Sequence, residues 1–199
     1  MSIVIAAAAL LLLRLGFLAP RATLATSAAA LLLAAFAGLT LPDIDQPLWL
    51  DHRSAVTHSI LPAIAVLVRR WALPVASGLG FGTGLHLSAD LFPNAMIGFA
   101  TVKMPFAGSI GAEASYAWIA INLVACLWLG GFALRQAVAH EPLRRLILGA
   151  VALLGAFYLL RVDGGWAALA LFLAIGGAAL YGSERLGLIL ANRRATTRL

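Results

Sequence analysis

Aspartate and histidine side chains are concentrated in one stretch of this sequence. Four of the five aspartates and three of the four histidines lie between Asp43 and Asp90. Carboxylate oxygens and imidazole nitrogens are ligands for divalent metals in catalytic sites. They are also costly side chains to keep at membrane depth, and most of the remaining sequence is apolar. We therefore predict that this stretch forms a functional metal-binding site.

Helical spacing makes His86 and Asp90 the most definite pair of candidate ligands. Residues four apart on a helix share one face about one turn apart, so both side chains could bind the same metal. Asp43 and Asp45 are two apart and could hold a metal together or bridge two metals. His58 is a further imidazole candidate. We predict that all five side chains are metal ligands.

Neighbouring residues could complete a hydrolytic site. Three or four protein ligands and an open position would lower the pKa of a bound water toward about 7, which supplies a hydroxide nucleophile. His52 or Asp51 could move protons, and Arg53 could hold an anionic oxygen of a phosphate through its planar guanidinium. Thr57 and Ser59 are candidates for hydrogen bonds to the ligands.

Each of these residues also has an ordinary structural explanation. Asp43 and Asp45 could cap a helix or lie in a solvated turn, and His58 could cap a helix or donate to a carbonyl. Arg53 could pair with Asp51 at the surface, where an ion pair contributes little. Only 11% of the residues are charged, so chance is a poor explanation for the whole cluster.

The elements that carry the cluster are predicted to be membrane helices. Of 199 residues, 62% are hydrophobic and 11% charged, against about 45–50% and about 25% in soluble domains. We expect an all-α, polytopic membrane protein that forms a single domain over 1–199, with a motif-bearing core at 25–110 and C-terminal helices at 114–190. About seven apolar segments approach the length of a span. They are approximately 2–19, 22–41, 55–71, 72–91, 114–134, 144–161 and 165–190.

Small residues and a lone thiol constrain the packing of these segments. Gly78, Gly80, Gly82 and Gly84 make the fourth segment small on one face, which lets helix backbones approach closely. Cys126 is the single cysteine and lies within an apolar run, so an intramolecular disulfide is excluded. We expect its thiol to be buried and inert.

The basic residues predict an orientation. With seven spans, eleven of the 14 Lys and Arg residues fall in the tail and the loops of one side. Such an excess marks the cytoplasmic side, so we expect a cytoplasmic C-terminus and a cluster that faces the periplasm of a bacterial inner membrane. Topology thereby explains the net charge of +6. Since no recognition motif accompanies that charge, we expect no nucleic-acid partner.

The cluster resembles the motif of the YdjM-like family, which comprises inner-membrane-associated metal-dependent hydrolases. That motif is approximately Pro-Asp-hydrophobic-Asp, then His-Arg-Gly-x-Thr-His-Ser, then His-x-x-x-Asp. The resemblance covers about residues 25–110, roughly half of the chain. The matching residues are Leu41-Pro42-Asp43-Ile44-Asp45, His52-Arg53, Thr57-His58-Ser59, and the pair His86 and Asp90. One departure is Ser54, which stands where the family has glycine.

The resemblance implies metal ligands at the five residues named above, with His52 as a further candidate. The family is distantly similar to zinc-dependent phospholipases C and single-strand nucleases, which share the His-x-x-x-Asp helix element. That similarity implies a divalent metal, zinc first, and a phosphoester substrate. Many family members carry a histidine near the N-terminus, whereas no histidine precedes His52 in this chain.

We therefore expect a metal-dependent hydrolase at the outer membrane face that acts on a phosphoester or lipid-like substrate among the membrane lipids. The alternative is a non-enzymatic membrane subunit of a larger complex, in which the polar or metal cluster is structural and a membrane-protein partner docks. An ion or metal transporter ranks last, because almost no acidic residues or histidines continue into the inner half of the predicted spans.

Overall fold

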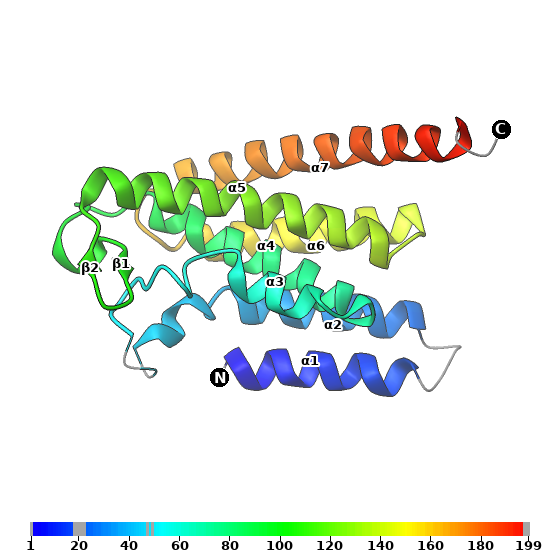
Figure 1. Cartoon of the computed structure of the whole chain (residues 1–199), viewed down its shortest axis with the longest axis horizontal. Helices are drawn as coiled ribbons and strands as arrows, with labels where there is room; N and C mark the ends of the chain where they lie inside the picture. Colours follow the sequence, from blue (N-terminus) through cyan, green and yellow to red (C-terminus); the bar gives the residue numbers. More distant parts are fainter. Residues whose placement is uncertain (1, 18–22, 47, 49, 197–199) are drawn as a thin grey trace.

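The computed structural model describes residues 2–17, 23–46, 48 and 50–196, and its regular secondary structure within these is helical apart from one two-stranded ribbon. The α-helices other than the short α3 run back and forth between two ends of the molecule (Figure 1). The elements are α1 (Ser2–Phe17), α2 (Thr23–Gly38), the 3-10 turn η2 (Pro42–Asp45), α3 (Leu61–Leu67), η3 (Arg70–Ala72), α4 (Leu73–Asp90), η4 (Gly98–Ala100), β1 (Lys103–Met104), β2 (Gly108–Ser109), α5 (Ala112–Ala137), α6 (Glu141–Leu159) and α7 (Gly165–Thr196). The expected boundary between the first two segments lies outside the described residues.

Three helices of the described chain are long and apolar enough to cross a membrane: α5, α6 and the Gly165–Gly182 part of α7. The all-helical prediction is confirmed, whereas a count of about seven spans is not supported. α6 and α7 bury only 22% of their most apolar stretches within the protein. Exposed apolar helices of this kind are stable in lipid. Large exposed hydrophobic side chains on the three helices include Ile121, Leu146, Leu153, Trp166 and Leu173.

The third predicted segment, 55–71, is not a spanning helix, and this part of the prediction is wrong. Its α-helix covers only Leu61–Leu67, about 10 Å at 1.5 Å per residue. The residues before this helix form turns. The hydroxyls of Thr57 and Ser59 donate hydrogen bonds to nearby backbone carbonyls, and these bonds compete with the backbone hydrogen bonds of a helix. Pro62 lies in the first turn of the short helix, where proline favours a start.

α4 lies at the centre of the bundle and packs against α2 and α5. Its glycines permit close approach, as expected, but on two faces and not one. A Cβ at Gly78 or Gly82 would overlap backbone atoms of α2, whereas a Cβ at Gly80 or Gly84 would overlap atoms of α5. The main apolar core joins α4 to α5, α6 and α7, and a second core lies between α1, α2 and α4.

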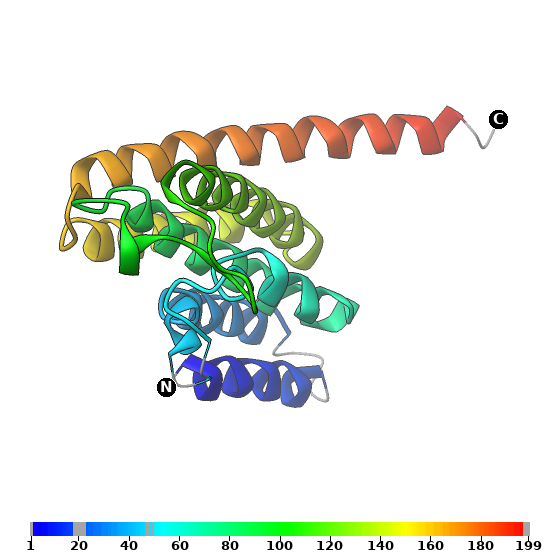
Figure 2. The same ribbon diagram turned by 60° about the vertical axis from the view of Figure 1, so that its left-hand side comes forward.

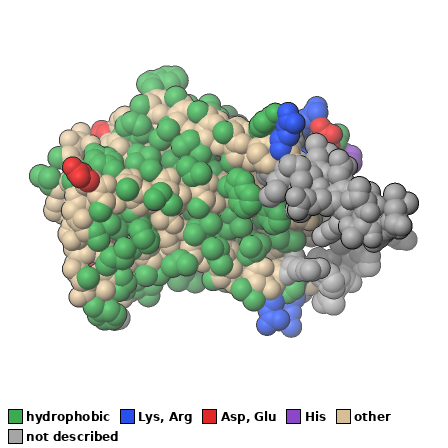
Figure 3. Space-filling model, turned by 45° about the horizontal axis from the view of Figure 1, so that its top comes forward, with side chains coloured by type: hydrophobic (Ala, Val, Ile, Leu, Met, Phe, Trp, Pro, Cys, Tyr) green, Lys and Arg blue, Asp and Glu red, His purple; other side chains and the backbone are tan. Residues whose placement is uncertain are grey.

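The loops gather at two ends that differ in character (Figures 1 and 2). We call them the site end, which carries the aspartate and histidine cluster, and the arginine end. Lys and Arg side chains on the face drawn in Figure 3 lie at the arginine end, and the flank between the ends is hydrophobic. Arg21 and Arg198 are also expected at the arginine end, but both lie outside the described residues. The site end comprises loops 39–60, 91–111 and 160–164, and the arginine end comprises loops 68–72 and 138–140.

Candidate metal centre

The five predicted ligands come from three separate segments that meet at the site end. Asp43 and Asp45 lie on η2, directly after α2. His58 lies in the turns that precede α3, and the pair His86 and Asp90 lies on the last turns of α4. The close α2–α4 packing brings the first and third segments together, so the cluster depends on the glycines described above.

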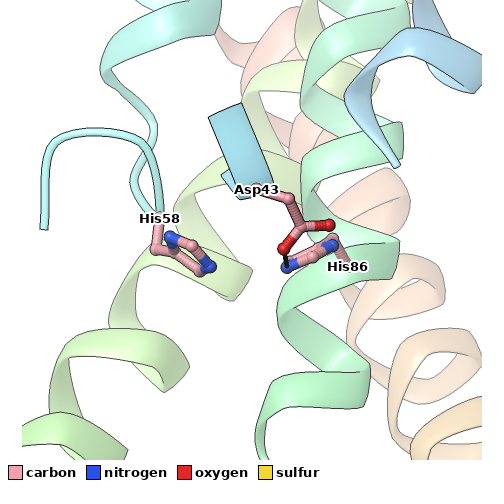
Figure 4. A group of neighbouring side chains, drawn as sticks. All are labelled: Asp43, His58 and His86. Carbon is pink, nitrogen blue, oxygen red and sulfur yellow. Dashed lines mark ion pairs between the residues drawn. The ribbon is translucent and has the colours of Figure 1, made fainter. Parts of the chain in front are cut away.

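Asp43, His58 and His86 form a group that could hold a metal ion, with one ligand atom from each within 4.8 Å of the others (Figure 4). His86 Nε2 lies 3.8 Å from Asp43 Oδ1. Asp90 Oδ2 lies 3.5 Å from His58 Nε2 and 3.4 Å from His86 Nε2. Both imidazoles are buried, whereas 48% of the Asp43 side chain is exposed. This carboxylate therefore forms the solvent side of the group.

The His86 ring is oriented by a backbone carbonyl. His86 Nδ1 lies 2.8 Å from the carbonyl oxygen of Leu39, at the end of α2. A carbonyl only accepts hydrogen bonds, so Nδ1 carries the proton. His86 Nε2 is then the nitrogen that faces the carboxylates of Asp43 and Asp90. Burial disfavours the charged ring, but the charge of Asp90 outweighs burial and raises the pKa of His86 to about 9, so a metal would have to displace the Nε2 proton. Tyr158 also approaches this ring, with its hydroxyl 3.5 Å from Nδ1.

The His58 ring is oriented by a side chain. The hydroxyl of Thr57 donates to the carbonyl oxygen of Ser54 and lies 3.1 Å from His58 Nδ1. Its oxygen therefore accepts from Nδ1–H, which leaves the Nε2 lone pair directed at Asp90. Burial first, and then the charge of neighbouring His86, lower the pKa of His58 to about 3, so the ring is neutral at pH 7. Thr57 thus contacts the predicted ligand His58, as expected, while the Ser59 hydroxyl donates to the carbonyl of Val56.

The group fits a divalent metal. His58 Nε2 and Asp90 Oδ2 are buried and have no hydrogen-bond partner within the described protein. Buried polar atoms left in this way cost about 1–3 kcal/mol each. Two atoms that bind one zinc at 2.0–2.1 Å in a tetrahedral site are roughly 3.3 Å apart. The observed 3.4 and 3.5 Å separations match this value and exceed the usual 2.7–2.9 Å of a charge-assisted N–H···O bond.

Asp45 lies on the other side of the His58 ring. Its Oδ2 accepts a hydrogen bond from the backbone N–H of Ser54 at 3.1 Å and lies 3.5 Å from His58 Nδ1. The side chain is fully buried, and burial raises the pKa of Asp45 while the Ser54 N–H opposes the rise. Asp45 is therefore placed to orient His58. That Asp45 itself binds a metal stays a prediction.

Arg53 contacts a predicted ligand and not Asp51. Its Nη2 lies 2.7 Å from Asp90 Oδ1, and its Nη1 donates to the carbonyl oxygen of Ala100. The surface-pair explanation is therefore wrong, since the guanidinium is buried and fixes one oxygen of Asp90. Asp90 Oδ2 is left for the two histidines. That Arg53 holds a substrate anion stays a prediction.

His52 and Asp51 occupy different surroundings. The His52 ring stacks on Phe99 at a centroid separation of 3.8 Å and lies 6.3 Å from the His58 ring. Burial lowers the pKa of His52, against the opposing charge of nearby carboxylates. Asp51 is exposed and lines a separate cavity of about 150 Å³ beside Lys103. The structure thus places His52 beside the centre, whereas the proton-transfer role of either residue stays a prediction.

Several supporting groups were not predicted. The Leu39 and Ala100 carbonyls belong to apolar residues, so residue type carried no signal for them. From α5, Trp118 Nε1 donates to the His58 carbonyl at 3.1 Å, and Asn122 Oδ1 accepts from the Ile60 N–H at 3.0 Å. Asn122 is a buried amide within an apolar helix, and such residues rarely occur without a partner. That signal was available in the sequence.

No protein-family model, curated protein or solved structure matches this chain. The candidate centre therefore stands on its own geometry, and the resemblance to the YdjM-like family stays an expectation. The geometry supports a group of buried imidazoles and carboxylates that could hold a metal ion and does not select which metal.

Proposed function

We propose that the chain is a metal-dependent hydrolase of the YdjM-like kind, embedded in a membrane and acting on a phosphoester or lipid-like substrate. One observation carries the proposal. Two buried imidazoles direct their Nε2 atoms toward Asp90, and the third member of the group, Asp43, is half exposed. A centre with one ligand at the solvent side leaves a position for water or substrate, as catalytic zinc sites do.

Asp43, His58, His86 and Asp90 would hold the metal, for which zinc is our first candidate. A divalent ion bound there would supply Lewis acidity and lower the pKa of a coordinated water toward about 7. The protein's own part is to fix the ligands, as Arg53 does for Asp90. The remaining proton carrier beside the centre is His52, which would accept a proton and return it to a leaving group.

The position of the centre suggests the substrate and the orientation. The three helices that are long and apolar enough to cross a membrane each have one terminus at the site end, so the centre would lie near lipid headgroups. Arginines gather at the opposite end, and basic residues mark the cytoplasmic side of bacterial membrane proteins. The site would then face the periplasm, with the C-terminus in the cytoplasm. A lipid phosphoester could reach such a centre without leaving the bilayer.

A structural metal in a non-enzymatic membrane subunit is the second candidate. It is favoured by the origin of the ligands, because η2, the turn before α3 and the end of α4 would be linked by one ion. Structural sites use four protein ligands and keep no open position. The exposure of Asp43 favours the enzyme over this alternative.

Hydrolysis by right-side-out membrane vesicles tests the proposal. Vesicles containing the full chain and supplied with zinc should cleave a short-chain phospholipid or a nitrophenyl phosphodiester added outside, without lysis. His86→Ala should reduce the rate to background, because this residue supplies a ligand to the centre. Asp163→Asn changes an exposed carboxylate of the same end and should leave the rate unchanged. Equal rates for wild type and His86→Ala would refute the hydrolase. Loaded protein that cleaves neither ester would favour the structural metal.

A further inference from the structure

A groove lies between α5, α6 and α7, remote from the metal centre. It consists of two adjoining cavities of about 210 and 300 Å³. The first is lined almost entirely by apolar side chains, among them Phe81 and Phe172. The second is lined in part by Arg135 and Arg144. Both cavities are lined by Leu148, Gly177 and Leu180, so they form one continuous groove.

The two arginines define the polar end of the groove. Arg135 lies in the last turn of α5 and Arg144 in the first turns of α6. Both helices are long and apolar enough to cross a membrane, and they meet at this end. Basic side chains at such a level lie among lipid headgroups. The Arg144 guanidinium is held in place by donating to the Val138 and Ala139 carbonyls.

The apolar part of the groove is not filled by the protein. A Cβ added at Gly176 or Gly177 would meet no atom within 4 Å. α6 and α7 also expose most of their apolar stretches, so this side of the molecule faces hydrocarbon in a bilayer. A flexible hydrocarbon chain is the natural occupant of an apolar groove that opens onto lipid.

We propose that this groove binds one anionic phospholipid, with an acyl chain along Gly177 and the phosphate beside Arg135 and Arg144. Basic pockets between membrane helices bind anionic headgroups through the same complementarity of charge. A second copy of the chain is a poorer occupant. In the same bilayer it would bring its own arginines to the same level, where like charges repel. The site is independent of the hydrolase proposed above.

Native mass spectrometry of the full chain in detergent tests the lipid site. The probes are dioleoyl phosphatidylglycerol and dioleoyl phosphatidylcholine, which share acyl chains and differ in headgroup charge. Because two arginines lie at the membrane surface, the affinity for the anionic lipid should exceed that for the zwitterionic lipid by about tenfold or more. Arg135→Gln and Arg144→Gln should each reduce that preference. Arg145→Gln is the charge-matched control, because Arg145 pairs with Glu141 and does not line the groove.

A second pair of variants tests the groove itself. Gly177→Leu should fill the apolar part and reduce the binding of both lipids several-fold, and the helix can accept the side chain because nothing lies within 4 Å. Gly149→Leu is the control, since it has equal space outside the groove. Equal retention of the two lipids by wild type would overturn the proposal. So would unchanged binding by Gly177→Leu, or a dimer that replaces the lipid-bound monomer.

Discussion

The two histidines of the candidate centre are oriented by the partners of their inner nitrogens. The Leu39 carbonyl fixes the His86 ring, and the Thr57 hydroxyl fixes the His58 ring. Both rings consequently direct Nε2 toward Asp90. The residue that remains to be assigned is Asp45, whose carboxylate is buried against the Nδ1 side of His58.

Asp45→Asn tests the role of this carboxylate. The amide keeps the volume and can still accept from the Ser54 N–H, but it loses the negative charge beside His58 Nδ1. Loss of a partner behind a metal-bound histidine typically weakens metal affinity by about 10–100-fold. We expect a loss in this range, measured by zinc competition with a chelator of known affinity. Asp51→Asn is the control and should leave the zinc affinity unchanged, because Asp51 lies on the same loop but is exposed and lines a different cavity.

An unchanged zinc affinity in Asp45→Asn would contradict the orienting role. Complete loss of zinc, equal to that of His86→Ala, would instead show that Asp45 is itself a ligand. The comparison with Asp51→Asn excludes a general effect of charge on the loop, because both variants remove one negative charge.

At the residue scale, spacing predicted some contacts and not others. His86 and Asp90 follow from helix geometry, because residues four apart must share a face. The Arg53 contact to Asp90 joins a loop to a helix across 37 positions, and no local rule predicts it. Arg53 also has a φ of 58°, a left-handed conformation that is uncommon outside glycine. The side chain there is buried against Asp90, whereas the sequence suggested a contact with a substrate anion or a surface pair with Asp51.

At the scale of elements, α4 depends on its glycines to hold the centre. A Cβ at Gly82 would overlap the Ala35 carbonyl oxygen and crowd Gly38 of α2. These are backbone atoms, which cannot rotate away as side chains do. His86 lies one turn beyond Gly82 and receives its orienting contact from Leu39. Separation of α2 from α4 would therefore also separate the two halves of the metal centre.

Gly82→Ala should destabilise the protein and weaken metal binding together. Overpacking of a tight interface typically lowers the free energy of unfolding by about 1–3 kcal/mol. We expect a lower midpoint of thermal unfolding in detergent and a weaker zinc affinity. Gly149→Ala is the control, because its added Cβ meets no atom within 4 Å. If Gly82→Ala has the same midpoint of thermal unfolding and the same zinc affinity as wild type, the close α2–α4 contact does not position the centre.

The elements themselves were predicted unevenly. Apolar runs predicted α2, α4, α5, α6 and α7, because helices that pack in an apolar core or cross a membrane both need long apolar stretches. The 55–71 run was equally apolar by count but contains Thr57 and Ser59, whose hydroxyls compete for the backbone. The hairpin between β1 and β2 is only two residues long on each side, so no alternation could reveal it.

At the scale of the whole molecule, two polar ends are separated by a hydrophobic flank (Figure 3). The carboxylates and imidazoles of the candidate centre lie at one end, and the arginines that border the lipid groove lie at the other. α7 extends beyond the other helices at the arginine end (Figure 2). Charge counting predicted this division, because basic residues lie where helices leave a membrane.

The metal content of purified wild-type protein tests the central claim most directly. After purification in detergent and dialysis against zinc, elemental analysis should find one ion retained per chain. His58→Ala and His86→Ala should lose it. His140→Ala is the matched control, because the fourth histidine caps α6 at the arginine end. Wild-type protein that retains no divalent metal, or His86→Ala protein that retains as much as wild type, would contradict the account.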